Sequence, residues 1–138
     1  MSSAVDPQVV DRLLRTSATW AVVGLSTNTA RAAYGVAAYL QRLGHTVVPV
    51  HPSAPTVHGV PGVRRLADLA EPPDVVDVFV NSRIAGGVVD EAVAAGARAV
   101  WLQLGVVDEA AAARARAAGL TVVMDRCPAI EGRARGLG

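Results

Sequence analysis

The sequence of 138 residues has no lysine, a single cysteine and few aromatic side chains. All of its positively charged side chains are arginines, so any phosphate would be bound by guanidinium groups or backbone amides. The one cysteine, Cys127, cannot form a disulfide within the chain, which agrees with a reducing compartment. Only 4% of the residues are aromatic while 51% are hydrophobic, so small aliphatic side chains must dominate the core.

Positive and negative charges nearly balance, at a formal net charge of +1, so the basic footprint of a nucleic-acid-binding protein is missing. No apolar run approaches the roughly 20 residues that a membrane-spanning helix needs. Residues 1–15 carry charges where a signal peptide would be apolar. The three histidines, His45, His51 and His58, match no standard spacing of metal ligands. We therefore expect a cytoplasmic protein that binds no nucleic acid, membrane or metal.

Short apolar runs alternate with helical segments along the whole chain. The runs that predict strands are 20–25, 45–50, 75–80, 99–104 and 121–124. The segments that predict helices are 6–16, 32–43, 87–96 and 108–119. Continuous apolar strands separated by helices are typical of a parallel sheet covered on both faces. The sequence therefore predicts one α/β domain over residues 1–138, with a three-layer, Rossmann-like, doubly wound parallel sheet of five strands within about 19–131.

Ligands of such sheets bind beyond the carboxyl ends of the strands. After the first strand come Gly24, Ser26, Asn28 and Arg31, where unpaired amides of the following helix could meet a phosphate. An ordinary helix-capping loop is the alternative, because serine and asparagine are common caps. The GxGxxG fingerprint is absent, since the next glycine after Gly24 is Gly35. This loop alone leaves phosphate binding undecided.

The end of the second strand is more informative. A NAD-binding domain usually has an acidic side chain there, which accepts hydrogen bonds from the adenosine ribose. This chain has Val50, His51 and Pro52 instead, with no acid nearby. The run therefore argues against NAD and is compatible with a 3′-phosphorylated adenosine. A rigid turn with an exposed histidine is the alternative interpretation.

Other polar residues near strand ends leave their roles open. Cys127 follows Arg126, and a neighbouring guanidinium would make a thiol more reactive, although a partly buried structural cysteine is the alternative. Gln103 and Asn81 could bind a ligand amide or the backbone of their own loops. No Ser-His-Asp arrangement, pair of carboxylates or general base is recognisable. No catalytic residue is predicted.

Taken together, several segments resemble the bacterial stand-alone CoA-binding proteins. The segments are Ala21-Val-Val-Gly-Leu-Ser26, Gly44-His-Thr-Val-Val-Pro-Val50, Asp77-Val-Phe79, Trp101-Leu-Gln-Leu-Gly105 and Val123-Met-Asp-Arg-Cys-Pro128. The fold of that family is similar to the CoA-binding domain of the succinyl-CoA synthetase alpha subunit. The resemblance runs from about residue 20 to 131, and it implies binding of coenzyme A at the first three strand ends.

By position, the resemblance implies a role for each part of this site. The residues that would face the pyrophosphate and the adenosine phosphates are Gly24, Ser26, Asn28 and Arg31. Those that would flank the adenine are Pro49, Val50 and Pro52, with His51 between them. Those that would border the pantetheine arm are Phe79, Val80, Gln103 and Gly105.

The sequence also departs from the family pattern. The family commonly has Asn-Pro after the second strand, often with a lysine soon after, where this chain has His51-Pro52-Ser53. It often has an arginine after the Asp-Val-Phe run, where Val80 and Asn81 stand here. Both changes remove polar or basic contacts to the ligand. Arg83 and His51 are the residues that we consider as substitutes.

Four functions remain open on the sequence. The leading one is a non-catalytic module that binds CoA or an acyl-CoA. The second is the CoA-binding subunit of an acyl-CoA ligase-type complex, which would need a separate partner chain. The third is a sensor of NAD(P) or another nucleotide. The fourth is a thiol-regulatory protein that acts through Cys127.

Overall fold

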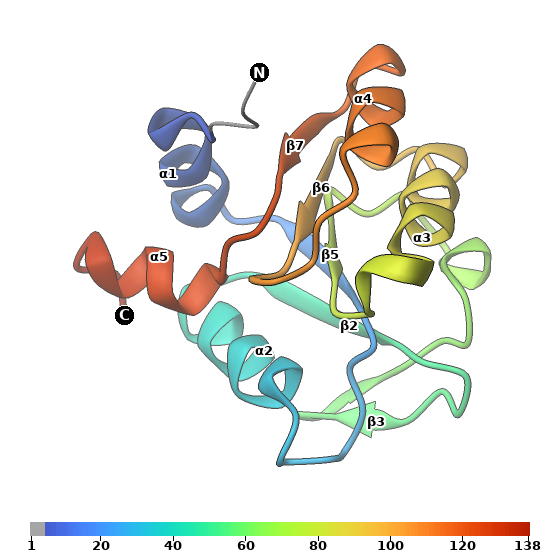
Figure 1. Cartoon of the computed structure of the whole chain (residues 1–138). Coiled ribbons are helices and arrows are strands. Elements are labelled where there is room, and N and C mark those ends of the chain that lie inside the picture. The colour runs from blue at the N-terminus through green and yellow to red at the C-terminus, as the bar shows by residue number, and fades with distance from the viewer. Residues whose placement is uncertain (1–4) are drawn as a thin grey trace.

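The computed structural model of the chain describes residues 5–138, in which a five-stranded parallel sheet lies between two layers of helices (Figure 1). In spatial order the strands are β2 (Thr46–Val50), β1 (Thr19–Val23), β5 (Val75–Val78), β6 (Ala99–Leu102) and β7 (Thr121–Val123). This arrangement confirms the predicted Rossmann-like, doubly wound sheet. The chain runs outward from β1 to β2 and then returns to β5 on the other side of β1. The switch in strand order therefore lies between β1 and β5, where such sheets bind ligands.

Helices cover both faces of the sheet. On one face lie α1 (Pro7–Arg15), α2 (Ala32–Arg42) and α5 (Pro128–Ala134), and on the other lie α3 (Ser82–Ala94) and α4 (Glu109–Ala117). Two separate hydrophobic clusters form the core, one under each helical layer. None of the helices within residues 5–138 is long and apolar enough to cross a membrane.

The helix starts follow local capping chemistry. The Asp6 carboxylate accepts a hydrogen bond from the backbone N–H of Gln8 at 2.9 Å, and α1 begins between these two residues, at Pro7. The Asp108 carboxylate accepts one from Ala111 N–H at 2.9 Å at the start of α4. The Asn81 side chain accepts one from Arg83 N–H at 3.0 Å, so α3 begins at Ser82 rather than near residue 87.

Four short elements are not among those predicted from the sequence. They are α5, the antiparallel pair of β3 (Thr56–Val57) and β4 (Val60–Pro61), and the 3-10 turn η1 (Leu66–Asp68). The pair β3–β4 and η1 lie in the connection between β2 and β5. This connection starts at the carboxyl end of β2, at the edge where sheets of this type bind ligands.

The cluster beneath α1, α2 and α5 contains two neighbouring indoles, whose planes are tilted by 48°. Trp20 on β1 and Trp101 on β6 are fully buried, with ring centroids 5.5 Å apart. The buried His45 ring lies 5.3 Å from Trp20, and the Trp101 indole N–H donates to the Arg126 carbonyl at 2.9 Å. The cluster beneath α3 and α4 is aliphatic apart from Met124. The expectation of small aliphatic packing therefore fits the second face better than the first.

Candidate functional site

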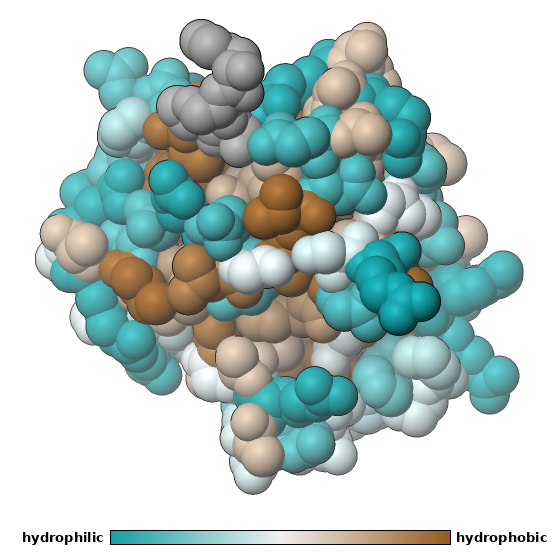
Figure 2. Space-filling model, viewed as in Figure 1, coloured by the Kyte–Doolittle hydropathy of each residue, from teal (hydrophilic) through white to brown (hydrophobic). Residues whose placement is uncertain are grey.

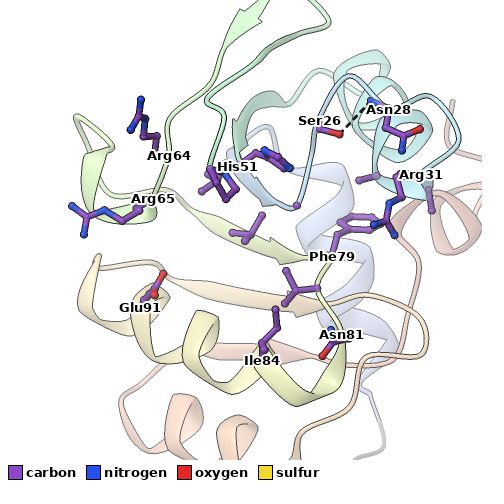
Figure 3. A pocket seen from close by; sticks show the side chains of 17 residues that line it. Ser26, Asn28, Arg31, His51, Arg64, Arg65, Phe79, Asn81, Ile84 and Glu91 are labelled. Atoms are coloured by element: carbon purple, nitrogen blue, oxygen red, sulfur yellow. Dashed lines mark hydrogen bonds between the residues drawn. The ribbon is translucent and has the colours of Figure 1, made fainter.

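A cleft of about 690 Å³ opens at the carboxyl ends of β1, β2 and β5, at the switch point of the sheet (Figure 3). Nine of the residues predicted for the site line it: Gly24, Ser26, Asn28, Arg31, Val50, His51, Pro52, Phe79 and Val80. Non-local pairing of three strands brings these residues together from three separate segments of the chain. Pro49, Gln103 and Gly105, which were also predicted, do not line the cleft.

The loop after β1 is held by its own polar side chains. The N–H of Gly24 donates to the Val50 carbonyl at 2.9 Å, which ties the end of β1 to the end of β2. The Ser26 hydroxyl accepts from Asn28 N–H at 3.2 Å, and the Asn28 side-chain oxygen accepts from Ala30 N–H at 3.0 Å. These bonds give the loop one defined path over the cleft.

The first turn of α2 faces the same cleft. Arg31 occupies the N-cap position and forms no side-chain cap, and the next two residues, Ala32 and Ala33, also line the cleft. The first amides of a helix have no partner within the helix, and the helix dipole makes this end favourable for an anion. The exposed guanidinium of Arg31 adds a full positive charge at the same place.

His51 follows β2 and is held in one tautomer by its turn. The N–H of Ser53 donates to His51 Nδ1 at 3.2 Å, and the Ser53 hydroxyl lies 2.9 Å from the same nitrogen. Because Nδ1 accepts, the proton of the neutral ring is on Nε2. The ring therefore offers one hydrogen-bond donor on the side away from its turn.

The turn after β5 forms the third wall. Phe79 and Val80 are half-buried, and Asn81 both lines the cleft and caps α3. Ile84, in the first turn of α3, is 57% exposed at the rim. This wall is more apolar than the wall formed by the loop after β1.

Two arginines that the sequence analysis did not select also line the cleft. Arg64 and Arg65 lie on the His51 side of the cavity, opposite Arg31 (Figure 3). Arg83, which had been considered as a substitute for a missing basic contact, is not among the lining residues. Glu91 is the one acidic residue that lines the cleft in the described part of the chain. Three guanidinium groups and one carboxylate thus give the lining of the cleft a net positive charge.

The three predicted residues outside the cleft have structural environments of their own. Pro49 is buried within β2, and its carbonyl accepts from Val63 N–H at 2.9 Å. Gln103, just beyond β6, is 8% exposed, and its side-chain oxygen has no hydrogen-bond partner within residues 5–138. Gly105 has a positive φ of 86° and donates to the Asp125 carboxylate at 2.7 Å. Gln103 and Gly105 lie one strand farther from the switch point than Phe79 does.

Large apolar side chains are exposed beyond the ends of β5, β6 and β7. They are Ile84, Leu104, Val107 and Ile130. Figure 2 shows brown surface over α5 and over the loop that follows β6. The Ser82 hydroxyl donates to the Gly105 carbonyl at 3.3 Å and accepts from Val107 N–H at 3.0 Å, so the loops after β5 and β6 are joined. The apolar wall of the cleft therefore continues toward β6.

Two buried ionisable groups lie outside the cleft, one within β5 and the other, His45, just before β2 at the amino end of the strands. Asp77, in the middle of β5, is fully buried with no partner for either oxygen among the described residues, and burial raises its pKa well above the usual range. Burial lowers the pKa of His45, although hydrogen bonds to the backbone of Leu14 and Ala18 act in the opposite direction. Burial therefore favours the uncharged form of both groups.

Cys127 is not part of the cleft. Its side chain is 8% exposed and belongs to the hydrophobic cluster that contains Trp101, Val123 and Ala129. The guanidinium of Arg126 donates to the Asp125 carbonyl at 2.8 Å. The thiol therefore lies in a packed environment at the start of α5.

Residues 18–133 match the profile of the family described as the CoA binding domain. The chain belongs to this family. The match confirms the resemblance inferred from the sequence, and it places the cleft within a CoA-binding domain.

Proteins similar to this chain include small chains of about its length and one much larger enzyme. The uncharacterized protein YneT of Bacillus subtilis (strain 168) is 35% identical over 118 residues, which cover 86% of this chain and 87% of that protein. A hypothetical protein from Pyrococcus horikoshii OT3 has a similar structure, with a TM-score of 0.88 and 29% identity over 97% of this chain and 98% of that one. An acetyl-coenzyme A synthetase of Ca. Korarchaeum cryptofilum aligns over 84% of this chain and 28% of its own length, with a TM-score of 0.70. At 23% identity, the last similarity shows the fold alone.

Proposed function

We propose that this chain binds coenzyme A or an acyl-CoA in the cleft, as a cytoplasmic module that does not transform its ligand. The observation that carries the proposal is the composition of the cleft in a chain of this family. Its β2 end has His51 and Pro52 where a NAD site has an acid, and three arginines line it against one carboxylate. A ligand with several phosphates suits this charge balance.

The geometry supports a definite orientation of the ligand. The pyrophosphate would lie at the first turn of α2, where helix amides and Arg31 meet. The adenosine would lie beyond β2, against Val50, His51 and Pro52. The pantetheine arm would leave past Phe79 toward the exposed apolar side chains after β5 and β6.

The polar groups of the cleft support binding rather than catalysis. Ser26 and Asn28 bond to the backbone of their own loop, and Asn81 caps α3. Ser53 and His51 form a Ser–His contact at 2.9 Å, but Ser53 does not line the cleft and its own N–H donates to the same ring nitrogen. A catalytic pair would need a free base aimed at the ligand.

The experiment is a thermal-unfolding and calorimetric titration of the purified chain with CoA and with NAD. We expect CoA to bind and stabilise the fold, by about 2.7 kcal/mol at a hundred times its dissociation constant, whereas NAD has little effect. Native mass spectrometry of freshly purified protein should show a co-purified ligand of CoA mass. Equal stabilisation by CoA and NAD would contradict the proposal.

A further inference from the structure

The segment that follows β4 is fixed to the end of β2. Val63 N–H donates to the Pro49 carbonyl at 2.9 Å, and His51 N–H donates to the Val63 carbonyl at 3.0 Å. Val63 thereby forms an isolated parallel bridge with Val50. The two residues after Val63, Arg64 and Arg65, are therefore held at the carboxyl end of β2, although they come much later in the sequence.

A glycine allows this close approach. A Cβ atom at Gly62 would lie 2.5 Å from the Pro55 carbonyl oxygen and 3.0 Å from the Pro49 carbonyl oxygen. Any larger residue would push the segment away from β2. The position of the arginine pair thus depends on the backbone contacts that Gly62 and Val63 make with the end of β2. It does not depend on the arginine side chains themselves.

Both guanidinium groups are available to an anion. Arg64 and Arg65 are exposed and line the cleft. Arg65 lies 3.7 Å from the Asp68 carboxylate, in an exposed pair of the kind that contributes little to stability. Within residues 5–138, Arg64 forms no salt bridge. Neither side chain is therefore committed to holding the fold together.

The position beyond β2 specifies what such a pair would bind. In doubly wound sheets this is where the adenosine ribose lies, and an arginine there accommodates a phosphate on the ribose. Arginine suits this role because its planar fork binds phosphate oxygens through two parallel hydrogen bonds. Arg31 stands on the opposite side of the cleft, so the two sets of cations can meet two different phosphate groups (Figure 3).

We propose that Arg64 and Arg65 form a second phosphate subsite, which binds the phosphomonoester on the ribose of the ligand. The inference rests on the proposed function, and it makes that function more specific. The chain would select 3′-phosphorylated CoA over dephospho-CoA, which shares the pyrophosphate and the pantetheine arm but lacks this one group. Arg31 and the first turn of α2 would serve both ligands equally.

The test is calorimetric titration of the full chain and of the double variant Arg64→Ala/Arg65→Ala with CoA and dephospho-CoA. The wild type should bind CoA roughly tenfold more tightly or better, as expected for charge-assisted phosphate contacts. The double variant should lose most of that preference, while its affinity for dephospho-CoA changes less than about twofold. Because both side chains are exposed, the unliganded variant should keep its melting temperature.

Further arms separate the possible outcomes. Arg64→Lys/Arg65→Lys should restore part of the preference, because charge remains but the bidentate geometry is lost. Arg116→Ala, an exposed arginine on α4 away from the cleft, should change neither affinity. Equal wild-type affinities for CoA and dephospho-CoA would overturn the subsite and leave CoA binding intact. Failure to bind CoA would overturn the proposed function, although tight NADP⁺ binding that needs the arginine pair would support a ribose-phosphate subsite for another dinucleotide.

Discussion

Gly24, at the end of β1, lies against the backbone of Phe79, at the end of β5. A Cβ atom at Gly24 would be 2.7 Å from the Phe79 carbonyl oxygen, and the φ of Gly24 is +102°. Both facts exclude a side chain here, because L residues rarely adopt this conformation and the carbonyl belongs to a strand end that cannot easily move. The glycine therefore brings two walls of the cleft together at the switch point of the sheet.

Replacing this glycine should be costly. Gly24→Ala is expected to lower the free energy of unfolding by about 1–3 kcal/mol through backbone strain alone, and the steric clash with Phe79 should add to this loss. Urea unfolding at constant pH measures the change. Gly87→Ala is the matched control, since a Cβ at this position in α3 would contact nothing within 4 Å. It should be neutral or stabilising by up to about 1 kcal/mol. Equal losses in the two variants would contradict the steric argument.

Arg31 should contribute to affinity without contributing to the fold. If its guanidinium contacts the pyrophosphate, Arg31→Ala should weaken CoA binding by about 1.5–3 kcal/mol, measured by calorimetry. The melting temperature of the unliganded variant should not change, because Arg31 is exposed and forms no salt bridge within residues 5–138. Arg83→Ala removes an exposed arginine that does not line the cleft and should leave affinity unchanged. An unaltered affinity in Arg31→Ala would make Arg31 a solvated surface residue.

The sequence predicted the sheet well because its strands are local apolar runs. All five predicted strands are present, and no strand boundary is shifted by more than two residues. Helix α3 begins at Ser82, earlier than the predicted start near residue 87, because the Asn81 side chain caps it there. Gly86 is tolerated because its missing side chain makes room for the Asp108 carboxylate, since a Cβ there would lie 2.8 Å from an oxygen of that group.

The site was only partly predictable, because some of the residues that line it do not directly follow a predicted strand in the sequence. The loop after β1 could be selected because it directly follows a strand. Arg64 and Arg65 could not, because only the bridge between Val50 and Val63 places them beside the end of β2. Pro49 precedes the strand end by one residue, and alternation along β2 turns it away from the cleft. Non-local pairing, which a single sequence does not reveal, decides such cases.

Asp77 should make stability fall as pH rises. Burial raises the folded-state pKa of this carboxyl well above the usual range, so the folded protein keeps the proton where the unfolded chain, with a pKa near 3.9, releases it. The associated stability is complete below about pH 4 and is lost as pH rises toward the folded pKa. Asp77→Asn, which mimics the neutral carboxyl, should therefore become more stable relative to the wild type between pH 4 and pH 8. Chemical unfolding of both proteins across this range measures the difference.

A surface carboxylate provides the control for this prediction. Asp90→Asn removes an exposed group that lies 3.0 Å from Arg114, and such pairs contribute roughly 0–1 kcal/mol. Its stability relative to the wild type should show little trend from pH 4 to pH 8. A relative stability of Asp77→Asn that falls with rising pH would show that Asp77 is ionised and bound in the folded protein.

His45 should act in the opposite direction. Burial lowers the pKa of His45 in the folded state below the value of about 6.5 in the unfolded chain. As pH falls below about 6.5, the unfolded chain therefore becomes protonated at His45 before the folded protein does. The stability that His45 contributes is complete above this pH and is lost as pH falls toward the folded pKa. His45→Leu removes the hydrogen bonds to Leu14 and Ala18 at every pH, at a cost of about 1–3 kcal/mol, but it removes the titration as well. Its stability deficit should therefore shrink between pH 7.5 and pH 5, and a constant deficit would contradict the assignment.

Cys127 should behave as a packing residue, although it is adjacent to Arg126. Its thiol is 8% exposed within a cluster that includes Trp101 and Ala129, and it does not line the cleft that CoA would occupy. A disulfide with CoA would need a thiolate that solvent and ligand can reach. Incubation of the native protein with CoA disulfide should therefore give no adduct in the intact mass, whereas the urea-unfolded chain should be modified. Because the sequence has one cysteine, the mass reports this thiol alone.

Cys127→Ser, which places a hydroxyl in the cluster, should lower the free energy of unfolding by about 1–3 kcal/mol and leave CoA affinity unchanged. An adduct that forms in the native state as fast as in urea would instead make Cys127 a reactive group of the ligand site.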